Sequence, residues 1–174
     1  MKFTDPSGVK TVQVTSNEVL EITLEDFSSG SRDFKLTVEL LAENAECHIK
    51  GRAQATGSDH KNWQIKQMFM GQDQTGTIDL RGTAEDDSFL GFDGNGTLTT
   101  TSRQADANIT EKIILFDNAR GRSLPVLRVE TDQVKSAGHG ASIAPVDPEK
   151  ILYFQSRGVN RKSAEALIKT GFLQ

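Results

Sequence analysis

The chain has 174 residues, a formal net charge of −4 and a sequence pI near 5.4. This length suits one domain whose core needs no disulfides, and the single cysteine, Cys47, cannot form one within the chain, which is typical of a reducing compartment. The acidic balance disfavours a nucleic-acid binder, no run approaches the ~20 apolar residues of a membrane span, and the start lacks the apolar stretch of a signal peptide. The composition therefore favours a cytoplasmic protein with neither a nucleic-acid partner nor a membrane span.

Short β-type runs follow one another along most of the chain. Residues 34–40 alternate apolar and polar side chains, which places Phe34 and Leu40 on the same face of a strand. Similar runs lie at 11–15, 19–27, 46–50, 63–69, 77–80, 89–92, 97–101, 109–116 and 126–129. Gly, Asn, Asp and Ser gather between the runs, and no helical pattern separates them. The pattern predicts an all-β body, for which a sandwich, a barrel and a β-solenoid all remain open.

The pattern changes at Asp147. This residue is a suitable helix N-cap, and Pro148 after it suits the first helical position. Asn160 can cap a second helix that ends near Gly171. The sequence therefore predicts a β body over residues 1–146 and a helical segment over residues 147–174.

The last third of the chain contains a long motif. It consists of Gly138-His-Gly-Ala-Ser142, Asp147, Glu149, Ile151-Leu-Tyr-Phe154, Ser156-Arg-Gly-Val159, Ala164, Leu167-Ile168 and Gly171-Phe172. In order and spacing this motif resembles the carboxyl-terminal segment of the SufB/SufD family of iron–sulfur cluster assembly scaffold proteins. Residues 43–51 and 108–128 are similar to further family motifs, so the resemblance covers roughly residues 35–174.

The resemblance implies a fold and a function. The fold is all-β: a right-handed parallel β-helix with a small C-terminal two-helix segment, in which Thr ladders such as that of residues 97–101 are tolerated. The function is that of a non-enzymatic scaffold subunit of the SUF machinery. Such a subunit pairs with itself or with a SufB/SufD-type paralogue, and it docks a SufC-type ABC ATPase.

His139 matches the histidine of the family's SHGA or EHEA motif. The resemblance implies that it lies where two subunits meet and contributes to a transient iron–sulfur cluster at a dimer interface, with no cluster held stably. Neutral imidazole is a suitable iron ligand. Gly138 and Gly140 replace the two carboxylates of the SufB pattern, so the motif is SufD-like. The alternative is a histidine that only packs at a dimer seam.

Cys47 stands in a segment similar to the one whose cysteine accepts sulfur in SufB. Lys50 and Arg52 nearby favour a lowered thiol pKa and persulfide formation. The strand alternation, however, places Cys47 on the same face as Ile49, so burial as a small apolar residue is the alternative. One cysteine also falls short of the four that iron–sulfur clusters usually use.

The helical segment is the family's docking region for the ATPase. The matching residues here are Tyr153, Phe154, Arg157, Gly158, Leu167, Ile168 and Phe172. The alternative role is to cap the last turn of the β body. Two other classes stay open: residues 157–172 loosely resemble half of a DNA-binding helix-hairpin-helix, and a β-helix also suits a carbohydrate-active protein. No motif of an enzyme active site occurs, so we expect no enzymatic activity.

Overall fold

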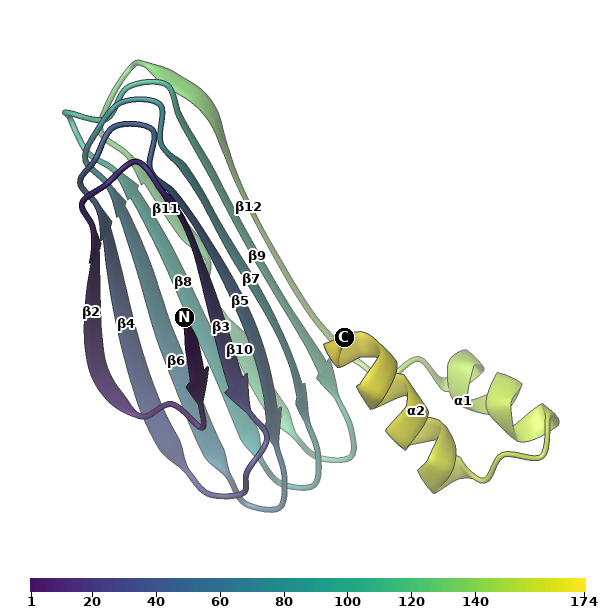
Figure 1. Cartoon of the computed structure of the whole chain (residues 1–174). Coiled ribbons are helices and arrows are strands. Elements are labelled where there is room, and N and C mark those ends of the chain that lie inside the picture. Colours follow the sequence, from purple (N-terminus) through teal and green to yellow (C-terminus); the bar gives the residue numbers. More distant parts are fainter.

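The computed structural model describes residues 1–174 as a tall β-helix with two helices beside its lower end (Figure 1). The strands are β1 (Lys2–Thr4), β2 (Gly8–Val14), β3 (Val19–Asp26), β4 (Arg32–Leu40), β5 (Glu46–Ala55), β6 (His60–Phe69), β7 (Thr75–Ala84), β8 (Phe89–Leu98), β9 (Ala105–Leu115), β10 (Arg120–Ser123), β11 (Val126–Val129) and β12 (Val134–Pro145). The helices are α1 (Pro148–Ser156) and α2 (Arg161–Leu173).

The strands form two parallel sheets between which the chain alternates. The first sheet has the order β1-β3-β5-β7-β9-β12, and the second has the order β10-β8-β6-β4-β2, with β11 also pairing β8. Every pairing is parallel, so each strand lies beside the strand one turn earlier. The coil is right-handed, the usual sense of parallel crossover connections. The predicted right-handed parallel β-helix with two C-terminal helices is thus confirmed.

Equivalent positions of successive turns stack in columns inside the β-helix. Ile22 pairs with Ile49, Ile49 with Ile78, and Ile78 with Ile109, and all four side chains are buried. Because parallel partners point to the same side of a sheet, this register makes a continuous apolar column. Aromatic residues of the second sheet make another: the ring centroids of Phe34 and Trp63 lie 6.5 Å apart, and those of Trp63 and Phe92 lie 5.6 Å apart. Stacking of this kind supplies most of the core.

The core also encloses an ion pair. The Lys61 side chain in β6 and the Asp26 side chain at the end of β3 are both fully buried, with Lys61 Nζ 2.6 Å from Asp26 Oδ1. The same ammonium group donates to the carbonyl oxygens of Ser28 and Gln54, each at 2.6 Å. Burial raises the pKa of the Asp26 carboxyl, and the hydrogen bond from Lys61 opposes that rise. The lysine therefore joins two turns of the coil from the inside.

The two helices begin where the sequence predicts. The Asp147 side chain accepts a hydrogen bond from the Glu149 backbone N–H at 2.9 Å, and Asn160 accepts one from Ser163 at 2.9 Å. α1 ends before Gly158, which has a φ of 83°, a conformation that glycine adopts without strain. α2 runs on to Leu173, beyond the predicted end. Neither helix combines the length and the apolar character that crossing a membrane would require.

Candidate functional site

The last turn of the β-helix ends in an open surface formed by β10, β11 and β12, which we call the end surface. β12 pairs with β9 along one edge and has no strand on the other. Four large hydrophobic residues of this turn are exposed by 39–52%: Leu124, Val126, Val129 and Ile143. Unpaired strand edges with apolar side chains are usually covered by another chain or segment. The end surface is therefore a candidate contact surface.

His139 stands at the end of the isoleucine column. In the register of β12 with β9 it lies opposite Ile109, so its imidazole takes the inward position that isoleucine occupies in the earlier turns. No further turn covers it, and the side chain is exposed. Its neighbours Gly138 and Gly140 take the outward positions. A Cβ added at Gly140 would meet no atom within 4 Å, so packing does not exclude a larger residue there.

A single chain does not offer a complete metal site at His139. No three His, Cys, Asp or Glu side chains come together anywhere in the molecule. The acid nearest in the register is Glu111, which is fully buried one turn below. Its Oε1 accepts from the Gly94 N–H at 2.5 Å and its Oε2 from Ser123 Oγ at 2.5 Å. His139 is therefore a single candidate ligand and not a metal site by itself.

Glu111 itself occupies a gap in the second sheet. Pro125, which has no N–H, interrupts the pairing of β10 and β11 with β8, and the carboxylate accepts the Gly94 N–H there. Burial raises the pKa of Glu111, while the hydrogen bonds from Ser123 and Gly94 oppose the rise. A Cβ on Gly94 would lie 2.6 Å from Glu111 Oε1, so only glycine leaves room for the carboxylate. Glu111 thus links Ser123, at the end of β10, to Gly94 of β8 in the turn below.

Cys47 lies inside the β-helix, not at the end surface. Its side chain is fully buried in β5, in one column with Leu20 and Gly76. Burial raises the pKa of the thiol to about 11. This is opposite to the lowered pKa that Lys50 suggested, because the lysine side chain points outward from the same strand. The geometry favours the alternative of a packed core residue, and sulfur acceptance by Cys47 stays a prediction that requires the coil to open.

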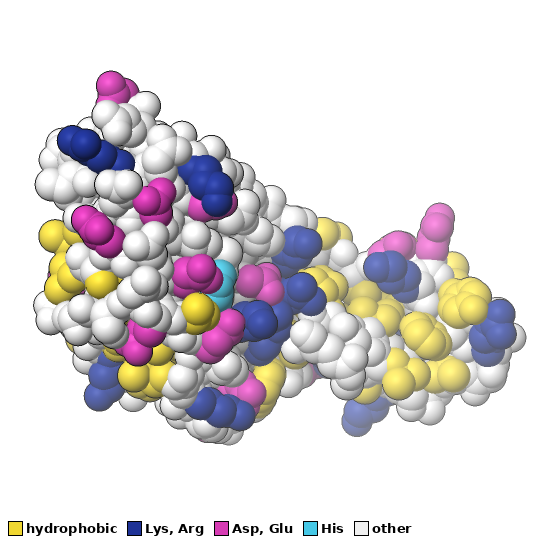
Figure 2. All heavy atoms as spheres, turned by 45° about the horizontal axis from the view of Figure 1, so that its top comes forward, with side chains coloured by type: hydrophobic (Ala, Val, Ile, Leu, Met, Phe, Trp, Pro, Cys, Tyr) yellow, Lys and Arg dark blue, Asp and Glu magenta, His cyan; other side chains and the backbone are white.

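The helical segment leaves much of its apolar surface exposed. Ile151 and Ala164 pack between the two helices and are buried. Among the predicted docking residues, Tyr153 is 55% and Leu167 is 52% exposed. The other apolar ones, Phe154, Ile168 and Phe172, are half-buried. Figure 2 shows hydrophobic side chains gathered on the visible face of this segment.

Arg157 lies at the tip of the helical segment and stacks on an aromatic ring. Its guanidinium carbon is 4.6 Å from the centroid of Tyr153, a cation–π arrangement. Both residues are exposed, and Gly158 directly after them forms the turn into α2. The structure thus brings three of the predicted docking residues together on one exposed corner.

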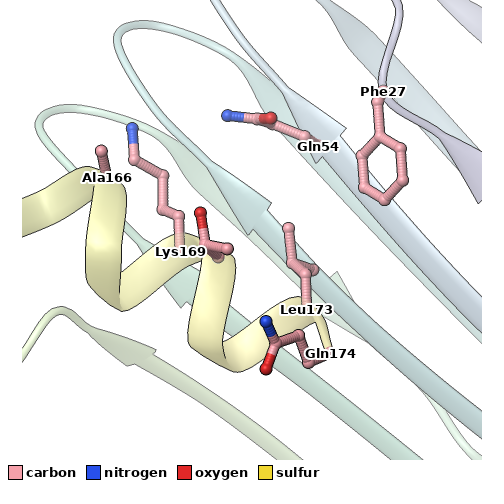
Figure 3. A pocket seen from close by; sticks show the side chains of 7 residues that line it. Phe27, Gln54, Ala166, Lys169, Leu173 and Gln174 are labelled. Carbon is pink, nitrogen blue, oxygen red and sulfur yellow. The ribbon is translucent and has the colours of Figure 1, made fainter.

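Lys169 of α2 joins the helical segment to the β-helix. The Lys169 ammonium pairs with Glu85 Oε2 and lies 5.0 Å from the centroid of Phe116. Beside this contact is a cleft of about 480 Å³. It is lined by Phe27, Gln54, Ala166, Lys169, Thr170, Leu173 and Gln174 (Figure 3). The segment is therefore anchored at the last turns of α2, and α1 projects away from the β-helix (Figure 1).

Sequence reasoning missed the three buried charged residues, Asp26, Lys61 and Glu111. Glu111 interrupts the apolar inward series Ile109 and Ile113, and Lys61 stands two residues before Trp63 in an inward position. The sequence signal for a buried charge was a charged residue that alternates with apolar residues along a strand and so takes an inward position. In a β-helix such a residue must find its partners inside the coil.

The comparisons with known proteins agree with the motif resemblance. The family model "SUF system FeS cluster assembly, SufBD core domain" matches residues 8–172. The chain is 28% identical over 155 residues to the iron–sulfur cluster assembly protein SufD of Bacillus subtilis, covering 88% of this chain and 35% of that protein. It is 34% identical over 64 residues to an iron–sulfur cluster assembly SufBD family protein of Mycobacterium tuberculosis (strain H37Rv), covering 37% and 16%. It is 30% identical over 82 residues to the SufD protein of Escherichia coli, covering 47% and 19%.

The chain spans about a third of the length of the Bacillus relative and less of the others. The matched part is the β-helix together with the helical segment, since the family model extends from β2 to the last turn of α2. This match covers far more than half of the chain. The protein therefore belongs to the SufBD family of the SUF iron–sulfur cluster assembly system.

Proposed function

We propose that this chain is a non-enzymatic scaffold subunit of iron–sulfur cluster assembly, which pairs through its end surface and docks an ABC ATPase of the SufC type through its helical segment. The observation that supports this most is the place of His139. An imidazole replaces the next isoleucine of an apolar column at the last turn, which no further turn covers. A buried position would favour another apolar residue, and a contact surface for iron favours the imidazole.

Pairing would cover the open edge of β12. The partner is a second copy of this chain or a SufB/SufD-type paralogue, joined about a two-fold or pseudo-two-fold axis. Such pairing buries Ile143 and Val129 and brings an imidazole from each subunit to one seam. The iron–sulfur cluster is then the cargo, assembled transiently with ligands from both chains. Two copies of this chain supply few ligands, so a paralogue with more of them is the better partner.

Docking would use the exposed apolar face of the helical segment. Tyr153 and Leu167 are large hydrophobic residues that are about half exposed to solvent. Aromatic residues such as Tyr153 are common at the centre of protein interfaces. Arg157 adds a directional charge beside Tyr153. Two short helices, of which α2 contacts the β-helix and α1 projects away from it, are also a suitable element to move when a partner changes shape.

Anaerobic reconstitution with iron and sulfide tests the scaffold function. The chain is incubated alone, with a SufB-type paralogue, and with the paralogue and the ATPase, and cluster formation is followed by visible absorbance. We expect absorbance that requires the partner and falls when His139 is replaced with Ala. His60→Ala is the control, because His60 lies on the surface at the start of β6, stacked on Phe89, and is two strands away from β10 of the end surface. Absorbance independent of His139 would reject its role as a ligand.

A charge reversal tests docking. Arg157→Glu is expected to leave folding almost unchanged, because the residue is exposed, and to reduce co-purification with the ATPase. Lys150→Glu is the matched control, since it makes the same charge change on an exposed position of α1. Equal binding by both variants would remove Arg157 from the docking surface. Failure of the parent chain to bind the ATPase would reject the docking function altogether.

A further inference from the structure

The outer face of the first sheet holds four cations around a single carboxylate. Arg52 pairs in register with Arg81, and Arg81 with Lys112, so these three side chains form one column on the outside of the β-helix. Lys50 lies in the neighbouring column, opposite Asp79. We call Lys50, Arg52, Arg81 and Lys112 the outer basic patch. Figure 2 shows Lys and Arg side chains close together on the part of the β-helix next to the helical segment.

The charges of the outer basic patch are not balanced within the chain. Asp79 Oδ2 is 2.9 Å from the Arg52 guanidinium, and Asp79 Oδ1 is 3.6 Å from Arg81 Nε. Glu25, the register partner of Arg52, instead pairs with Lys2 at 2.8 Å. No carboxylate lies within 4.0 Å of Lys50 or Lys112, and Arg81 Nε is buried without a hydrogen-bond partner. Four positive charges thus face one negative charge.

Such an arrangement costs stability in the isolated chain. Parallel strands lie about 4.8 Å apart, and like charges in direct register repel one another. The chain as a whole is acidic, with a net charge of −4, so an excess of cations is not a general property of its surface. An external anion would relieve the repulsion between these cations. Local conflicts of this kind are expected at binding surfaces.

The shape of the surface indicates which anion it suits. None of the four cations lines a cavity, so a small ion would not be enclosed. The cationic column is roughly 10 Å long across three strands, which suits an extended peptide, whose alternate side chains are about 7 Å apart. The next residue of the column after Lys112 is Ser142 in β12. Its side chain is small, so it leaves Lys112 accessible to a peptide from that side.

We propose that the outer basic patch binds an acidic, extended segment of a partner protein. Carboxylates of that segment would pair with Lys112, which has no internal ion pair, and with Arg81 beside it in the same column. The patch lies on the same sheet as the anchor of α2, which contacts β7 near Glu85. A protein bound to the helical segment can therefore also reach it. The inference goes beyond cluster assembly and does not depend on it, because the patch can be tested on this chain alone.

The test measures binding of a fluorescein-labelled octaglutamate peptide by anisotropy at physiological salt. The double variant Arg81→Gln/Lys112→Gln is expected to weaken binding roughly two- to thirty-fold, the range for two exposed ion pairs. The control Lys35→Gln/Lys66→Gln removes the same charge from the outer face of the second sheet and is expected to bind as the parent does. An equal loss in both variants, or no binding by the parent, overturns the proposal. Tighter binding of a single-stranded oligonucleotide of the same length overturns the choice of a peptide.

A second measurement needs no ligand. If the cations repel one another, Lys112→Gln raises the thermal unfolding midpoint at low salt, and the gain disappears at high salt because ions screen the repulsion. Lys35→Gln, which removes an isolated surface charge, should show no such salt-dependent gain. A lower midpoint for Lys112→Gln would mean that the chain itself compensates this charge, and would contradict the inference.

Discussion

Replacing Lys61 with Met is expected to destabilise the β-helix by about 3–5 kcal/mol, because the buried Asp26 carboxyl then keeps only its longer contact of 3.6 Å to Arg32. Both side chains are fully buried, and the ammonium also donates to the carbonyl oxygens of Ser28 and Gln54. Met fills a similar volume, so the loss measures charge and hydrogen bonding more than packing. A domain of this kind is stable by only about 5–15 kcal/mol in all.

The loss should depend on pH in a defined direction. Burial already raises the pKa of Asp26 above its ordinary value of 3.8, and Lys61 limits the rise. Without the lysine the folded state holds the proton on Asp26 still more tightly than the unfolded state does. The folded state is therefore favoured at low pH, and this advantage disappears as the pH rises through the raised pKa. The deficit of Lys61→Met is expected to be largest near neutral pH and to shrink toward pH 5.

Urea unfolding followed by tryptophan fluorescence measures the effect, since Trp63 lies two residues from the substitution in the same strand. The double variant Lys61→Met/Asp26→Asn is the control, because it removes both charges and should be more stable than Lys61→Met alone. A loss below about 1 kcal/mol, or a deficit that does not change with pH, would refute the reasoning that the buried pair joins the turns.

Three further predictions concern single contacts. Cys47 should react with iodoacetamide at pH 8 more than about 100-fold slower in the folded than in the unfolded chain, because a pKa of about 11 leaves few thiolates; rapid mass gain under native conditions would show that the coil opens. Glu111→Gln should gain stability relative to the parent as the pH rises above about 4.5, since the parent loses its tightly held proton there; parallel pH curves of the unfolding midpoint would contradict this. Lys169→Met should increase amide hydrogen exchange in α2 by removing the contacts to Glu85 and Phe116, and unchanged exchange would show that apolar contacts alone hold the helix.

Alternation predicted the full length of a strand only where the inward residues are large and apolar and the outward residues are polar. Residues 34–40 were identified almost completely, whereas β7 is much longer than the predicted run 77–80. The reason is that Gly76 and Gly82 take inward places in β7. A Cβ on Gly82 would lie 2.2 Å from Leu90, so a larger side chain from the second sheet fills the space that glycine leaves. Inside a β-helix, therefore, glycine can mark a core position and not a turn.

β12 was not recognisable from alternation for a different reason. Its residues are small and mostly exposed on both faces, because no turn covers it. The choice of a β-helix depended on the motif resemblance, which a family model covering residues 8–172 now supports. The motif also identified His139, but only the register shows that it follows Ile109 in the column. The inward direction of Cys47 did follow from its alternation with Ile49.

The anchor of the helical segment and the end surface are only one strand apart. Lys169 contacts Phe116, which directly follows β9, and β9 is the sole partner of β12 with His139. Since each turn of a solenoid contacts only its neighbours, a displacement of α2 should reach the end surface before the first turns. Hydrogen exchange of Lys169→Met tests this: faster exchange in β9 and β12 with unchanged exchange in β4 is expected. A change spread evenly over all turns would mean that the coil responds as one rigid body, and an ATPase docked on the helical segment would then have no selective effect at His139.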